Sequence, residues 1–197
     1  MRFVVDTANQ VIAKHGGTPV DFADFGRMTG LPLEALFRVA WPDLSAEDAV
    51  TYRAEYRAIY EEVAIPATRL YRGALTTLRA FRRAGIRQAT VTGKRAADCE
   101  RILRGLGLRR EVDAYLGGDS VPRPKPEPDL AIAAMERLGA RPEETAVVGD
   151  TRTDMRMARG AGALAVQVLW GVETERVPEA DLVVRTWPEL RERILRA

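Results

Sequence analysis

Several things that are scarce in this chain narrow its class. There is one cysteine, Cys99, so an internal disulfide framework is excluded and a reducing, cytoplasmic environment is indicated. No apolar run approaches the ~18 residues of a membrane-spanning helix, and the N-terminal MRFVVDTANQ lacks the apolar stretch of a signal peptide. The formal net charge is only +2 in 197 residues, which gives no electrostatic reason to expect a nucleic-acid or membrane partner.

Lysine is scarce as well. Of the 30 Lys and Arg residues only Lys14, Lys94 and Lys125 are lysine, and the other 27 are arginine. Because arginine is the default cation here, each lysine needs its own explanation. The hydrophobic content of 46% and charged content of 29% are typical of a globular protein with one domain, or with a core and a small satellite.

The first third of the chain reads as helical. Apolar residues recur at helical spacing over 4–15, 21–28 and 33–40, with Gly and Pro between these segments. Ser45 and Asp48 resemble a capping box. Behind them a long helix places Tyr52, Tyr56, Ile59 and Val63 on one face, and Pro66 marks its end. We therefore expect a helical domain over 1–66 and a second domain over 67–197.

The second part alternates strands with helices. Strands are expected over 86–92, 114–116, 145–148, 164–169 and 181–184, and helices over 75–81, 96–106, 129–138, 153–159 and 187–195. Such alternation predicts an α/β fold, a doubly wound parallel sheet of Rossmann-like type. Ligands of these sheets bind beyond the carboxyl ends of the strands, so the residues that follow each strand are the candidate site.

Two of these positions suit an anion. The first predicted strand ends in ATVTGK, where Thr92 offers a hydroxyl, Gly93 an accessible amide and Lys94 the start of a helix. In RPKPEP, Lys125 stands between two prolines that stiffen the loop and hold the ammonium in place. A lysine is a compact charge for phosphate, although a solvated loop lysine remains an alternative.

The segment VVGDTRTD carries a pair of carboxylates. Asp150 directly follows a buried strand and Asp154 stands four residues later. Such a pair is costly unless a cation lies beside it, and Mg²⁺ accepts oxygen ligands together with water and substrate phosphate. The alternative is a helix cap with an acid in the first turn, which fits Asp154 better than Asp150.

In this order the motifs resemble the haloacid dehalogenase (HAD) superfamily, within it the phosphoglycolate phosphatase-like branch. The resemblance runs from about Tyr71 through VTGK, GGDSVPRPKPEP and VVGDTRTDMRMARGAG nearly to the C-terminus. It implies that Thr92 and Lys125 are catalytic and bind the phosphoryl group with Gly93, and that Asp150 holds Mg²⁺ with Asp154 supporting it directly or through water. It also implies that the helical domain is the family's cap.

The family's nucleophile is not evident. HAD enzymes attack phosphorus with the first aspartate of Asp-x-Asp-Gly-Thr, at the end of a central first strand, and this chain has no such motif. Three interpretations stay open: the natural protein is longer; Arg2–Val5 form the missing strand, with Asp6 at its end; or the chain is a shortened, non-catalytic relative. Without that strand, two neighbouring strands would keep unpaired backbone groups.

Two functions follow from these observations. The first is a Mg²⁺-dependent phosphatase of a small phosphorylated metabolite, phosphoglycolate-like in type, that works as a monomer or homodimer. The second is a protein that binds phosphate or a partner without turnover. The sequence does not name the substrate, because the cap helices that would select it carry no motif.

Overall fold

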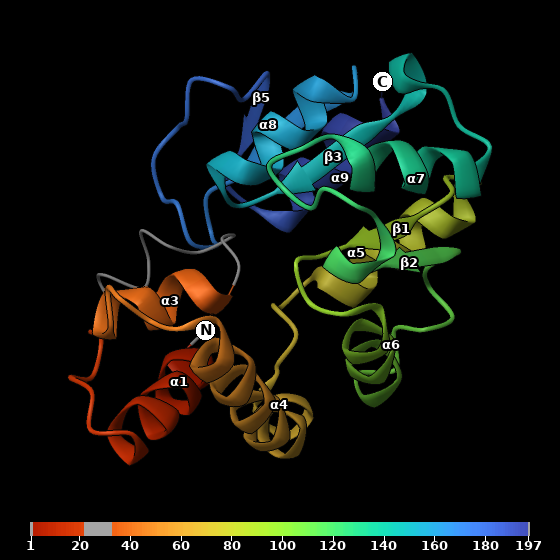
Figure 1. Ribbon diagram of the computed structural model, residues 1–197. Coiled ribbons are helices and arrows are strands. Elements are labelled where there is room, and N and C mark those ends of the chain that lie inside the picture. The colour runs from red at the N-terminus through yellow and green to blue at the C-terminus, as the bar shows by residue number, and fades with distance from the viewer. Residues whose placement is uncertain (1, 22–32, 197) are drawn as a thin grey trace. The chain divides into compact units, whose positions relative to one another are not determined.

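The computed structural model describes residues 2–21 and 33–196 (Figure 1). The chain separates into two compact units, Met1–Thr68 and Arg69–Ala197. The boundary expected from the sequence, after residue 66, lies two residues earlier. Among the described residues, no helix is long and apolar enough to cross a membrane.

The first unit is helical. Its described helices are α1 (Arg2–Lys14), α3 (Leu33–Ala40) and α4 (Ala46–Ala67). The helix expected over 21–28 lies almost wholly outside the described residues. Ser45 caps α4, because its Oγ accepts a hydrogen bond from the Asp48 amide at 3.0 Å. Pro66 lies inside α4, which ends one residue later rather than at the proline.

Residues 2–5 are helical, so the interpretation that Arg2–Val5 form a core strand is wrong. Val5, Ala8, Val11 and Ile12 are buried at the 3.6-residue spacing of one helix face. They pack in one cluster with Phe37 of α3 and with Tyr56 and Tyr60 of α4. Asp6 is exposed on α1 and does not lie at the end of a strand.

The second unit alternates helices and strands as expected. Its strands are β1 (Ala89–Val91), β2 (Ala114–Leu116), β3 (Ala146–Gly149), β4 (Leu164–Val168) and β5 (Leu182–Val184). Its α-helices are α5 (Ala74–Arg83), α6 (Ala96–Gly105), α7 (Asp129–Leu138), α8 (Arg152–Gly160) and α9 (Trp187–Leu195). All pairings are parallel, which confirms the α/β class.

The strands form two sheets rather than one. β1 pairs with β2, and β3, β4 and β5 form a separate sheet in that order (Figure 1). One core cluster nevertheless joins them, because Leu116 of β2, α7 and Met157 of α8 pack together with Val91 and Val147 at its margin. Within the described residues, β1 and β3 each have a strand neighbour on one side only.

One side chain of β3 is unusually exposed for a strand of this kind. Val148 is 43% exposed, although it stands in the middle of a core strand. Val166, its partner in the β4 register, is fully buried. Parallel strands normally have both faces covered, so an exposed valine inside such a strand is unusual.

β4 shows how the helices cover the second sheet. Val166 and Val168 pack with Phe81 of α5 and Leu190 of α9. Ala165, which points to the opposite face, packs with Met155 and Ala158 of α8. Because β4 is buried on both faces, its position is fixed. The loops that follow β4 and its neighbour β3 therefore also have fixed starting points.

Candidate active site

Lys125 and Asp154 form a close and largely buried ion pair in the α/β unit. Lys125 Nζ lies 2.6 Å from Asp154 Oδ1, and the two side chains are only 13% and 9% exposed. At this burial the pair is poorly screened by solvent, so the carboxylate holds the ammonium strongly in place. The stiff RPKPEP loop therefore delivers its lysine to the start of α8, where the second acid of VVGDTRTD stands.

Asp154 is itself held by the helix cap. Thr151 is the N-cap of α8, and its Oγ1 accepts from the Asp154 amide at 3.3 Å. Asp154 Oδ2 accepts from the Thr151 amide at 3.1 Å and from its hydroxyl at 2.6 Å. The capping alternative considered from the sequence is thus realised at Asp154. Because a carboxylate has about four acceptor positions, this oxygen pair can still accept from a further ligand or water.

Asp150 is fixed by the loop that follows β4. Its Oδ2 accepts from the Val172 amide at 2.9 Å, and its carbonyl oxygen accepts from the Glu173 amide at 3.1 Å. The close approach requires glycine at position 171, since a Cβ there would lie 2.1 Å from Asp150 Oδ2. No hydrogen bond to Asp150 Oδ1 is found among the described residues.

The sequence analysis missed the residues that hold Asp150. Glu173 Oε1 accepts from the Arg152 amide at 2.8 Å, so one loop binds both the carboxylate and the first turn of α8. Their position in the sequence could have indicated them. Val172 and Glu173 follow β4, the strand beside β3, and neighbouring parallel strands bring their carboxyl ends together.

Thr92 and Gly93 lie in a loop that a second turn keeps in place. The Thr92 amide donates to Leu116 O at 3.1 Å, and Gly118 N donates to Lys94 O at 2.7 Å. Gly117 packs so closely that a Cβ there would lie 2.0 Å from Ala96 N. A Cβ on Gly93 would meet no atom within 4 Å, so there is open space above this amide. The loop therefore offers a hydroxyl and an accessible backbone to a ligand.

Lys94 connects the two groups of predicted residues. Its pKa is lowered by desolvation first and by the charge of Lys125 second, although the side chain still reaches solvent. Asp150 acts on the same ammonium in the opposite direction. Lys94 is therefore within electrostatic reach of both Lys125 and Asp150. No hydrogen bond or ion pair among the described residues joins Thr92 or Gly93 to Lys125, Asp150 or Asp154.

The donor set at these strand ends is small. No group of three or more His, Cys, Asp or Glu side chains that could hold a metal ion occurs in the described part of the chain. Mg²⁺, however, is commonly bound by one or two carboxylates, with water and substrate phosphate completing its shell. The two carboxylates of Asp150 and Asp154 are of the type and number that such a site uses.

Comparison with known proteins decides the family. The model of the haloacid dehalogenase-like hydrolases matches residues 3–162. The chain belongs to this family. A probable phosphatase of Dickeya dadantii is 34% identical over 167 residues, which cover 82% of this chain and 73% of that protein. A phosphoglycolate phosphatase of Rhodospirillum rubrum is 30% identical over 182 residues, 88% of this chain and 76% of its own.

A solved structure supports the same assignment. A haloacid dehalogenase-like hydrolase from Bacteroides fragilis is 26% identical, with a TM-score of 0.87 over 96% of this chain and 91% of that chain. As a haloacid dehalogenase-like hydrolase, the chain is an enzyme of a family to which phosphatases belong. Its motifs VTGK, RPKPEP and VVGDTRTD lie at the ends of strands or in the loops between them.

Proposed function

We propose that this protein is a Mg²⁺-dependent phosphatase of a small phosphorylated metabolite, phosphoglycolate phosphatase-like in type. The observation that carries the proposal is the Lys125–Asp154 pair, which holds an ammonium near the strand end that bears Asp150. The phosphatases among its relatives support it. A cation held in a fixed position suits the charge of a phosphoryl group.

The residues divide the work as follows. The Thr92 hydroxyl and the Gly93 amide bind phosphoryl oxygens, and Lys125 neutralises the charge of the group in transfer. Asp150 holds Mg²⁺, and Asp154 supports the ion directly or through water while it orients Lys125. The bound ion supplies further charge neutralisation. The Val172 and Glu173 amides keep Asp150 in place.

The nucleophile belongs on a strand between β1 and β3. An aspartate oxygen attacks phosphorus, the bond to the leaving alcohol breaks, and water then hydrolyses the aspartyl-phosphate. Asp6 does not fill this role in the structure, because it lies on α1. The unpaired edges of β1 and β3, together with exposed Val148, fit one added parallel strand. We assign the aspartate to such a strand.

The test is phosphate release from an aryl phosphate with and without Mg²⁺. The 197-residue chain is compared with a form extended before Met1 by an apolar strand and Asp-x-Asp-Gly-Thr, and with the same extension carrying Asn for the first Asp. Of these three proteins, we expect Mg²⁺-dependent turnover only from the form whose extension carries the first Asp. Asp150→Asn in that form should abolish the turnover. Asp43→Asn, an exposed aspartate of the first unit, is the charge-matched control.

The alternative is a protein that binds phosphate or a partner without turnover. It was raised because no Asp-x-Asp-Gly-Thr motif occurs in these 197 residues. If both the chain and its Asp extension release no phosphate while Mg²⁺ and phosphate still bind, this alternative replaces the phosphatase. If the chain alone is active, the nucleophile lies within these 197 residues and its place between β1 and β3 is wrong.

The remaining expectations belong to the same proposal. The helical first unit serves as the cap that selects the substrate, which is a small phosphorylated molecule. The single cysteine, Cys99, is buried and free, as suits a reducing cytoplasm. The protein works there as a monomer or homodimer, without a nucleic-acid or membrane partner. Sedimentation at several concentrations measures the assembly state.

A further inference from the structure

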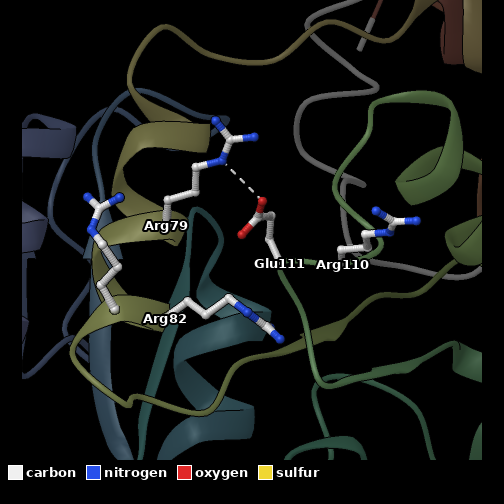
Figure 2. A pocket seen from close by; sticks show the side chains of 5 residues that line it. Arg79, Arg82, Arg110 and Glu111 are labelled. Atoms are coloured by element: carbon white, nitrogen blue, oxygen red, sulfur yellow. Dashed lines mark hydrogen bonds and ion pairs between the residues drawn. The ribbon is translucent and has the colours of Figure 1, made fainter.

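A second basic site lies on the α/β unit, apart from the residues assigned to the phosphatase. A cavity of about 550 Å³ is lined by Arg79, Arg82, Arg83, Arg110 and Glu111. Figure 2 shows that its side chains come from two places, α5 and the segment that precedes β2. The lining thus contains four guanidinium groups and one carboxylate, and only Arg79 is seen to contact that carboxylate. None of the residues assigned to phosphate or Mg²⁺ lines this cavity.

Hydrogen bonds hold Glu111 and the segment around it beside α5. Gln88 is buried, and its amide nitrogen donates to Leu78 O at 3.0 Å and to Glu111 O at 3.1 Å. Arg79 Nε lies 3.1 Å from Glu111 Oε1, while the Glu111 side chain is only 12% exposed. These contacts fix Glu111 and α5 relative to each other, so the arginines project from a common rigid base.

The cations outnumber the carboxylates beside them. Arg79 pairs with Glu111, and Arg82 Nη1 lies 3.5 Å from Asp113 Oδ1. Among the described residues, neither Arg83 nor Arg110 forms an ion pair. Arg82 and Arg83 stand in the last turn of α5, where the helix dipole favours cations. Arg110 comes from another segment, so the dipole of α5 does not account for its position.

We propose that this cavity binds a small, multiply charged phosphate anion, such as a polyphosphate chain or the phosphate groups of a nucleotide. Guanidinium groups bind phosphate oxygens through paired hydrogen bonds, and several around one hollow suit a ligand with several phosphates. Its volume falls in the range of small-molecule sites. Arg83 and Arg110 provide the charge that no carboxylate of the described chain neutralises.

Calorimetric titration with tripolyphosphate and with ATP, without Mg²⁺ and at low salt, tests this site. In R83Q/R110Q we expect affinity for both ligands to fall about tenfold or more, and wild-type affinity to weaken as salt rises. The matched control is R193Q/R196Q, which removes two exposed arginines from the end of α9. Equal affinity for the two ligands means that the phosphate chain alone is bound, and tighter ATP binding means that the nucleoside contributes.

Two further variants keep the test independent of folding and of the phosphatase site. E111Q removes the one negative charge lining the cavity, so it should tighten tripolyphosphate binding several-fold. K125A should leave this binding unchanged. The proposal is overturned if the wild type binds neither ligand at millimolar concentration, if R193Q/R196Q weakens binding as much as R83Q/R110Q, if E111Q does not tighten it, or if K125A abolishes it.

Discussion

Lys125 and Asp154 are 29 positions apart in the sequence, yet their charged atoms lie 2.6 Å apart and both side chains are largely buried. The pair joins the proline-rich loop to the first turn of α8. Removal of one member leaves the other charged and unpaired, which is more costly than the loss of a surface ion pair. The contact is therefore expected to matter for stability as well as for the proposed chemistry.

Asp154→Asn should destabilise the protein by about 2–4 kcal/mol in urea unfolding, somewhat below a fully buried pair because Lys125 keeps slight solvent access. The control is Asp129→Asn, which breaks a bidentate contact to Arg123, itself 65% exposed. That change should cost at most about 1 kcal/mol. Equal losses in the two variants would show that the Lys125–Asp154 pair behaves as a surface pair.

Thr151→Ala should cost more than an ordinary helix cap. Thr186 caps α9 by accepting from the Glu189 amide at 3.2 Å, so Thr186→Ala should lose about 1 kcal/mol. Thr151 caps α8, and its hydroxyl in addition donates to Asp154 at 2.6 Å; the residue is only 4% exposed. The free energy of unfolding should therefore fall by about 1 kcal/mol more in Thr151→Ala than in Thr186→Ala. Urea unfolding of both variants measures the difference, and similar losses would contradict the second role.

Glu55 is expected to make the stability of the first unit depend on pH. Hydrogen bonds from Lys14 and then His15 lower the pKa of Glu55. A lowered carboxyl pKa stabilises the fold above the ordinary value, about 4.5, and this contribution disappears as pH falls through the lowered value. Glu55→Gln should therefore lower Tm by at most about 3 °C at pH 7 and by nothing near pH 2. Glu62→Gln, an exposed change on the same helix, should leave Tm unchanged at both pH values.

Local sequence signals located much of the fold. The predicted bounds of α3, β2, α7 and α9 are those observed, because caps, glycines and prolines stand at their ends. β1 was expected over 86–92 but spans only Ala89–Val91. The Gln88 amide donates to the Asp113 carboxylate instead of a strand partner, and this tertiary contact has no local signal.

The site was harder to predict than the fold. Thr92, Lys125 and Asp150 were predicted as site residues because each follows a strand or stands in a proline-rich loop, and their roles stay a prediction. The contact between Lys125 and Asp154 could not be read from spacing, since it depends on where the loop passes α8. Val172 acts through its backbone amide, which is present in almost every residue and therefore leaves no mark in the sequence.

Gly171→Ala tests whether that backbone positions Asp150. The new Cβ would lie 2.1 Å from Asp150 Oδ2, so the carboxylate or the loop must move. The assay uses the form extended by the apolar strand and Asp-x-Asp-Gly-Thr. We expect the Mg²⁺ concentration for its half-maximal activity to rise about tenfold or more, as for other changes that displace a metal-binding carboxylate. Val172→Ala is the matched control, because it alters the neighbouring side chain but keeps the amide that donates to Asp150 at 2.9 Å. An unchanged Mg²⁺ requirement in Gly171→Ala would mean that Asp150 does not hold the ion in the position seen here, and an equal effect in both variants would point to loop packing rather than to the carboxylate.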